Sequence, residues 1–210
     1  MFGIQIRYLS FFFALIAALS FLNIIYSYYL NLYLNLDTYY LSLIVSLLMS
    51  VIFYKLNISK KKINIYDKIL TVFLGYLLLP LVISIPFYFS IYNLTFLNSF
   101  FESISGFTST GFTIFDNIKH IDQSLILWRS TTQWIGGLYF LFSIIYLIDI
   151  YDDSFKKTLT NFLSFDSSEI LKQAFKIFFL YSLLTLFIFL ILNFSSIRSF
   201  DSLNLAFTII

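Results

Sequence analysis

The sequence predicts an all-α polytopic membrane protein: two N-terminal helices, one complete helix–pore loop–helix repeat and the start of a second. Composition is the first observation, because 60% of the 210 residues are hydrophobic, only 11% are charged and the mean hydropathy is +0.88. Soluble domains carry about 25% charged residues. A core of this size could not hide so much apolar surface from water, so the solvent must be the lipid bilayer. The second observation is a series of five long apolar stretches.

The same composition narrows the classes of function. The chain has no Cys and a single His, His120, so disulfides, thiol catalysis and a histidine metal cluster are excluded. The apolar stretches carry no paired acids for acid–base or metal chemistry. A membrane enzyme is therefore the weaker hypothesis, and no cofactor is expected. The small net charge of +2 gives no reason to expect a nucleic-acid partner.

The first two apolar stretches, Tyr8–Leu30 and Tyr39–Tyr54, predict a pair of transmembrane helices within residues 1–60. A spanning helix needs about 20 residues, and the second stretch is a little short. The first exceeds the apolar region of about 7–15 residues in a signal peptide and lacks a clean cleavage site, which favours an uncleaved helix.

The other three stretches divide the rest of the chain. We expect the first repeat at 61–150, a polar cytoplasmic connector at 151–173 and the start of a second repeat at 174–210. Both prolines, Pro80 and Pro86, fall in the third stretch and should bend it, for packing rather than as a gating hinge. The three stretches are Ile69–Tyr92, Leu125–Ile148 and Ala174–Phe194.

The basic residues predict the orientation. Ten of the thirteen lie at the N-terminus or around the connections between stretches two and three and between four and five. Since the cytoplasmic side carries the excess of Lys and Arg, the N-terminus should be cytoplasmic. The ten are Arg7, Lys55, Lys60, Lys61, Lys62, Lys68, Lys156, Lys157, Lys172 and Lys176; the other three are Lys119, Arg129 and Arg198.

Between the third and fourth stretches, the segment Phe96–Gly106 predicts a short helix, with Asn98 or Ser99 as its N-cap. Its length of about 15 Å is half a bilayer, so it cannot cross. The hydroxyl-rich segment Phe107–Phe112 then breaks the helix, and we expect it to return as an extended strand. The predicted geometry is a re-entrant pore loop, about residues 97–112, entered from outside.

Backbone without internal hydrogen bonds survives at membrane depth only where protein surrounds it or it lines water. A ring of carbonyl oxygens from such a loop can replace the hydration shell of a monovalent cation. Gly111 would permit a backbone conformation that strains other residues, and the C-terminal end of the short helix favours a cation. The residues alone leave one alternative open: an ordinary outer loop with a short interfacial helix.

The motif "ESISGFTSTGFTIF" (Glu102–Phe115), followed by "LWRSTTQWIGG" (Leu127–Gly137), closely resembles the first pore repeat of the Trk/Ktr/HKT superfamily of potassium transporters. The two helices before the repeat favour the Trk-type membrane subunit. The resemblance implies membrane–pore–membrane repeats around one cation pathway and a filter made by the carbonyls of Thr108, Ser109, Thr110 and Gly111. Ser109 and Phe112 depart from many relatives, which leaves the width of the outer mouth open.

The resemblance further implies potassium uptake across the bacterial inner membrane, with K⁺ as the transported ion and no metal beyond K⁺ at the filter. Expected partners are the lipid bilayer, a second copy of the chain and a cytosolic nucleotide-binding regulatory subunit. Glu102 and Arg129 are expected to support the filter, although a snorkelling interfacial Arg and a direct effect of Arg129 on permeation stay open. We expect Gly136 and Gly137 to allow close helix contact.

A weak internal repeat supports this assignment. The segment Phe200–Ile210 can be laid on Leu97–Phe107 at an offset of 103 residues, each beginning with a capping Asn or Asp followed by Ser. On that register the second pore helix stops before its filter, so we expect 210 residues alone not to conduct K⁺. Two alternatives remain: a transporter remnant with a structural or assembly role, and a Na⁺-permeable relative.

Overall fold

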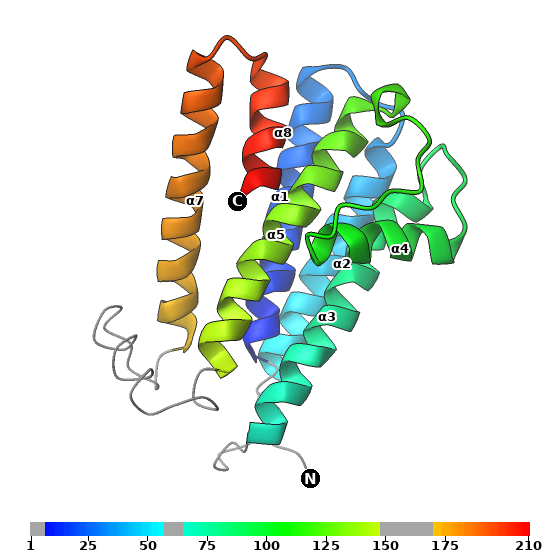
Figure 1. Ribbon diagram of the computed structural model, residues 1–210. Coiled ribbons are helices and arrows are strands. Elements are labelled where there is room, and N and C mark those ends of the chain that lie inside the picture. The colour runs from blue at the N-terminus through cyan, green and yellow to red at the C-terminus, as the bar shows by residue number, and fades with distance from the viewer. Residues whose placement is uncertain (1–6, 57–64, 148–169) are drawn as a thin grey trace.

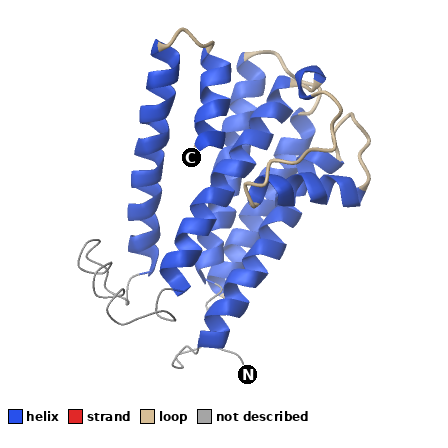
Figure 2. Cartoon of the chain, viewed as in Figure 1, coloured by secondary structure: helices blue, strands red, loops and turns tan. Residues whose placement is uncertain are grey.

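The structure is a computed structural model that describes residues 7–56, 65–147 and 170–210. Its regular elements in those ranges are all helices (Figure 2), which confirms the predicted fold class. The predicted lysines Lys60, Lys61, Lys62, Lys156 and Lys157, and most of the predicted connector 151–173, lie outside the described residues. Among the described residues, four helices are long and apolar enough to cross a membrane: α1, α2, α3 and α7.

The first two helices, α1 (Arg7–Tyr29) and α2 (Leu36–Lys55), form an antiparallel pair that packs along its length. Small polar side chains line the contact: Ser20 and Ser42 share a hydrogen bond of 3.1 Å, and Ser50 donates to the carbonyl of Ser10 at 2.9 Å. Small residues let helix backbones approach closely where lipid provides no hydrophobic drive for association. The second helix is longer than the predicted Tyr39–Tyr54, so its length is no obstacle to spanning.

The third long helix, α3 (Ile65–Tyr88), lies four residues earlier than the predicted Ile69–Tyr92 and runs through both prolines. The apolar run continues to Tyr92, but the backbone turns at Ser90, and Asn93 adopts a positive φ of 49°. The prediction was wrong at this boundary because hydropathy does not distinguish the end of a helix from an apolar turn.

The fourth long helix, α5 (Gln123–Leu147), runs through the middle of the bundle, in contact with α1, α3, α4, α7 and α8 (Figure 1). It is not among the four spanning candidates, because its N-terminal half is rich in Ser, Thr and Gln. Those polar residues are mostly buried against other helices, so they do not meet lipid. Trp128, for example, is fully buried and donates from Nε1 to the carbonyl of Ile83 at 3.1 Å.

A polar cluster ties the N-terminal pair to the rest of the bundle. Asn35, just before α2, donates from Nδ2 to Asp122 Oδ2 at 3.0 Å and accepts from the backbone N–H of Ile91 at 3.1 Å. Ser124 donates to the same Asp122 oxygen, and its hydroxyl lies 3.0 Å from that of Tyr39. One side chain before α2 thus holds both the end of α3 and the start of α5.

The last two helices are α7 (Ile170–Phe194) and α8 (Ser199–Ile209). Because α7 begins at Ile170, the last four residues of the predicted connector belong to this helix. The short helix α8 turns back between α7 and α5 and ends part-way along α5 (Figure 1). Most of α7 is exposed and apolar, as expected of a lipid-facing helix.

Candidate functional site

The short helix α4 (Phe96–Phe107) lies where the sequence predicted it, within one residue, and runs across the long helices (Figure 1). Its N-cap is Thr95, whose Oγ1 accepts from the N–H of Asn98 at 3.3 Å. The prediction of Asn98 or Ser99 as the cap was wrong. The helix begins earlier because Thr95 provides both an extended backbone and a side-chain oxygen. Its first residues are exposed and its last are buried.

The buried end of α4 rests directly on α5. A Cβ added to Gly136 would lie 1.9 Å from the carbonyl oxygen of Phe107, so only glycine allows this contact. A Cβ added to Gly106, the residue before Phe107, would lie 2.9 Å from Cγ2 of Thr132, which is one turn before Gly136 on α5. Gly137 faces α7 instead, where a Cβ would lie 2.5 Å from the hydroxyl of Tyr181. The prediction of close helix contact at both α5 glycines is confirmed.

After Phe107 the chain turns instead of extending. Thr108 has φ −87° and ψ 5°, and Ser109 adopts a left-handed φ of 55°. The expectation of an extended strand from Phe107 was wrong, because the first loop residues stay bonded to the helix end. The N–H groups of Ser109 and Thr110 donate to the carbonyls of Gly106 and Ser105, each at 2.9 Å, and the N–H of Gly111 donates to the carbonyl of Ser105 at 3.3 Å.

These bonds fix the direction of three carbonyls. In a trans peptide the C=O of one residue points opposite to the N–H of the next. The described residues contain no cis peptide. Because the N–H groups of residues 109–111 point at the end of α4, the carbonyls of Thr108, Ser109 and Thr110 point away from it. Within the described residues no hydrogen bond ends on these three oxygens.

The hydroxyl groups of the loop bind one another and the helix. Thr108 donates from Oγ1 to the carbonyl of Ile104 at 2.8 Å, and its Oγ1 lies 2.6 Å from that of Thr110. The loop residues Thr108 to Phe112 are exposed in this chain. The Thr hydroxyls thus anchor the start of the loop to the end of α4.

Gly111 ends the row. It has φ +79°, a conformation that L-residues rarely adopt, whereas the nearest atom to a built Cβ is Gln133 Nε2 at 3.8 Å. Its carbonyl accepts from Nη2 of Arg129 at 3.2 Å. Glycine is thus needed here for its backbone conformation and not for lack of space. Unlike the preceding three, its carbonyl already has a partner.

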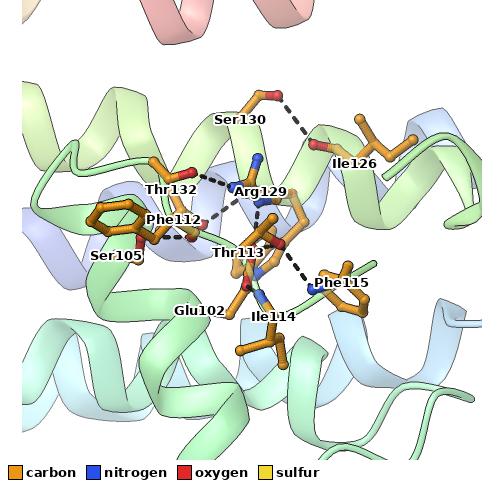
Figure 3. Close-up of polar contacts among 12 residues, drawn as sticks. Glu102, Ser105, Phe112, Thr113, Ile114, Phe115, Ile126, Arg129, Ser130 and Thr132 are labelled. Atoms are coloured by element: carbon orange, nitrogen blue, oxygen red, sulfur yellow. Dashed lines mark hydrogen bonds and ion pairs between the residues drawn. The ribbon is translucent and has the colours of Figure 1, made fainter. Parts of the chain in front are cut away.

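Glu102 lies fully buried beneath the loop and holds three groups (Figure 3). One oxygen, Oε1, forms an ion pair with Nε of Arg129 and accepts from Thr113 Oγ1 at 3.1 Å. The other, Oε2, accepts from the N–H of Ile114 at 3.1 Å. Since a buried charge is costly unless paired and hydrogen-bonded, this arrangement compensates the carboxylate. It also joins α4, α5 and the segment after the loop.

The structure thus brings all six predicted site residues together at the C-terminal end of α4. It adds two that the sequence prediction did not include, Ser105 and Thr113. Ser105 donates from Oγ to the carbonyl of Phe112 at 2.7 Å, and Thr113 binds Glu102 as described. The available signal for each was only a hydroxyl residue close to the loop in sequence, and serine and threonine occur throughout this chain. The six are Glu102, Thr108, Ser109, Thr110, Gly111 and Arg129.

A bundle of long apolar helices that holds a short helix and a loop ending at a glycine defines a multi-pass membrane protein. The sequence model of the family described as "TrkH: Cation transport protein" matches residues 42–203. This match covers more than half of the chain, so the chain belongs to the TrkH family.

Several known proteins are similar in sequence to this chain over part of their length. An uncharacterized cation transporter of Methanocaldococcus jannaschii is 30% identical over 110 residues, 51% of this chain and 23% of that protein. The Trk system potassium uptake protein TrkH of Escherichia coli K12 is 35% identical over 81 residues, 38% of this chain and 17% of that protein. TrkI of Halomonas elongata is 42% identical over 60 residues, 29% and 11% of the two chains.

A solved structure has a similar fold over nearly the whole of this chain. The crystal structure of the potassium transporter TrkH from Vibrio parahaemolyticus superposes with a TM-score of 0.74 at 20% identity, covering 96% of this chain and 41% of that one. This chain therefore has the fold of the matching part of TrkH, and it spans less than half of the length of that structure.

Proposed function

We propose that this chain forms part of a potassium uptake transporter and that its loop supplies one wall of the selectivity filter. The carrying observation is the row of carbonyls at Thr108, Ser109 and Thr110, directed away from α4 by the N–H bonds of the next residues. Carbonyl oxygens replace the hydration shell of K⁺ in known filters. The family membership and the names of the relatives support the same substrate.

The electrostatics of the site favour a cation. The C-terminal end of a helix carries about half a negative charge, and the carbonyl row begins where α4 ends. Glu102 and Arg129 are paired and contribute no net charge together. We therefore propose both as supports of the filter: Glu102 fastens the segment after the loop, and Arg129 binds the Gly111 carbonyl. The ligands offered to the ion would then be three carbonyls from this loop and not four.

The test is potassium uptake by the gene's full-length product in a bacterial strain that lacks its own potassium uptake systems. We expect growth at low external K⁺ and uptake that Na⁺ inhibits only weakly. Equal inhibition by Na⁺ would favour the Na⁺-permeable alternative. Stable, correctly inserted protein without cation uptake would favour the remnant with a structural or assembly role.

We further propose that the chain lies in the bacterial inner membrane with its N-terminus in the cytoplasm. The ends of α2 and α5 and the starts of α1, α3 and α7 lie at one end of the bundle (Figure 1), and Lys55, Lys68 and Lys176 belong to this end. Arg198 lies in the opposite turn. Single cysteines at Lys55 and Asn117, exposed at opposite ends, can be tested with an impermeant thiol reagent on intact cells. Labelling at Asn117 alone is expected; labelling at Lys55 alone would reverse the orientation.

A second copy of the chain and a cytosolic nucleotide-binding regulatory subunit are the proposed protein partners. The support for both is the resemblance to Trk-type subunits. The cytoplasmic end is basic and would be the contact for a cytosolic subunit. Cross-linking in native membranes, followed by identification of the linked proteins, tests both.

A further inference from the structure

Ser105 lies in the last turn of α4 and contacts the loop through both its backbone and its side chain. Its carbonyl accepts the N–H groups of Thr110 and Gly111. Its Oγ donates to the carbonyl of Phe112 at 2.7 Å, and the residue is 4% exposed. The two sets of contacts lie on either side of Gly111, the loop glycine with positive φ.

This side-chain bond differs in direction from those of the other two serines of α4, Ser99 and Ser103. A helical serine commonly donates to the carbonyl three or four residues before it in its own helix. Ser103 does so within α4, to Phe100 at 2.8 Å, and Ser143 does so within α5, to Tyr139 at 2.7 Å. Ser105 instead donates to a residue seven positions later in sequence.

This bond limits the freedom of the glycine. Glycine has the widest choice of backbone conformations, so the carbonyls around it are the least fixed by local sterics. Ser105 Oγ holds the carbonyl after Gly111, and Arg129 Nη2 holds that of Gly111 itself. With both held, the row of free carbonyls ends at Thr110.

We propose that Ser105 is a positioning residue for the cation filter, acting through the Phe112 carbonyl to fix where the carbonyl row ends and so to set K⁺ over Na⁺ preference. This inference rests on the proposed function. A hydrogen bond of this kind contributes enough to change the relative stability of two loop conformations by about fivefold. Because a filter discriminates ions by the placement and number of its carbonyls, a change of that population alters selectivity before it alters folding.

The matched control is Ser103, which is buried on the same helix and bonded only within it. We would measure K⁺ uptake and its inhibition by Na⁺ for the full-length product carrying Ser105→Ala or Ser103→Ala, together with the melting temperature of each purified protein. We expect Ser105→Ala to lower K⁺ over Na⁺ preference about fivefold, while Ser103→Ala keeps the wild-type preference and both proteins melt at similar temperatures.

A second pair of variants separates the effect of the hydroxyl group from the effect of the side chain's shape. Ser105→Thr keeps an Oγ donor and Ser105→Val replaces it by a methyl group of similar size, so any steric cost is shared. Preference should be higher in the threonine variant than in the valine variant. If Ser105→Ala does not accumulate in the membrane, the comparison of Ser105→Thr with Ser105→Val still tests whether the hydroxyl sets the K⁺ over Na⁺ preference.

Two results would overturn the inference: wild-type preference in both Ser105→Ala and Ser105→Val, or an equal loss in Ser103→Ala. A wild-type protein that inserts stably but takes up no K⁺ would overturn the proposed function, and this inference with it. A K⁺-selective wild type together with Ser105→Ala and Ser105→Val variants of wild-type preference would overturn the inference alone.

Discussion

The two short helices, α4 and α8, occupy equivalent positions in the sequence and are held in different ways. They begin at Phe96 and Ser199, the same offset of 103 residues that relates the two segments in sequence. Helix α4 is capped by Thr95, contacts α5 through backbone and carries a buried ion pair. Helix α8 follows Arg198, which makes no side-chain cap, so the predicted capping Asp was wrong here.

The contacts of α8 are made by side chains. Ser130 of α5 donates to Oδ1 of Asn204 at 2.6 Å, and the rings of Trp134 and Phe207 lie 5.8 Å apart. Its ion pair, Arg198–Asp201, is exposed, with 85% and 39% of the two side chains accessible. Within the described residues, the fully buried ion pair and the backbone contact thus belong to α4, whose C-terminal end carries the loop of residues 108–111. Four pairs of substitutions test this comparison.

The largest effect is expected for Gly136→Ala, because the added Cβ would meet the backbone carbonyl of Phe107 at 1.9 Å. Backbone cannot move aside as a flexible side chain can, so we expect a loss of about 3 kcal/mol of stability. The measurement is the melting temperature and the yield of folded protein in detergent. Ser130→Ala, which removes the hydrogen bond to Asn204 of α8, should cost about 1 kcal/mol. Equal losses of stability in the two variants would contradict the difference between the α4–α5 and α8–α5 contacts.

The second effect concerns the two ion pairs. Glu102→Gln removes one partner of a pair whose side chains are 0% and 15% exposed, and should cost about 3 kcal/mol or more. Asp201→Asn alters the exposed pair of α8 and should cost less than about 1 kcal/mol. Thermal unfolding of the two purified variants gives the comparison. A marginal change in Glu102→Gln would show that the buried pair does not hold α4.

The third effect is one of selectivity. Gly111→Ala has room for its Cβ but places it at φ +79°, a strain of about 1–2 kcal/mol, so K⁺ over Na⁺ preference should fall by up to about tenfold. Ser109→Gly is the matched change, since it relieves a positive φ of 55° in the same loop. It should leave stability unchanged or slightly higher. Cation competition in uptake assays tests Gly111→Ala, and thermal unfolding tests Ser109→Gly. Unchanged preference in Gly111→Ala would indicate that residues 108–111 form an ordinary loop.

The smallest effect concerns the caps. Thr95→Ala removes the side-chain acceptor of the Asn98 N–H and should destabilise the protein by about 1 kcal/mol. Ser199→Ala, at the start of α8, removes an exposed hydroxyl that donates to Asn193 and should change stability by less than about 0.5 kcal/mol. Amide hydrogen exchange in the first turns of α4 and α8 measures the two effects separately. A larger loss at Ser199 would reverse the comparison.

A second contrast, between α5 and α7, shows the limit of hydropathy. Both have 25 residues, yet only α7 is apolar enough to count as a membrane span by composition. Helix α5 carries Ser, Thr and Gln because other helices surround it, and helices that do not face lipid need not be apolar. The sequence predicted this helix from its apolar run, but its central place follows only from packing.

The sequence by itself determined the membrane class, the order of the helices, the short helix at 96–107 and the residue types of the loop. Apolar runs of fixed length and the helix-breaking "TSTG" segment are local properties, so they can be inferred without knowing the neighbours. The glycine at 111 was likewise predicted for a special backbone conformation, and it has one.

The tertiary structure alone decided which groups the loop residues bind. The turn at Thr108 and Ser109, the bond from Ser105 to Phe112 and the partner of the Gly111 carbonyl all join residues on different elements or beyond a helix end. A hydroxyl or carbonyl has several partners within reach of the chain, and sequence cannot rank them. Only the packing of α4 on α5, through Gly136, brings Arg129 and Glu102 together and leaves three carbonyls free.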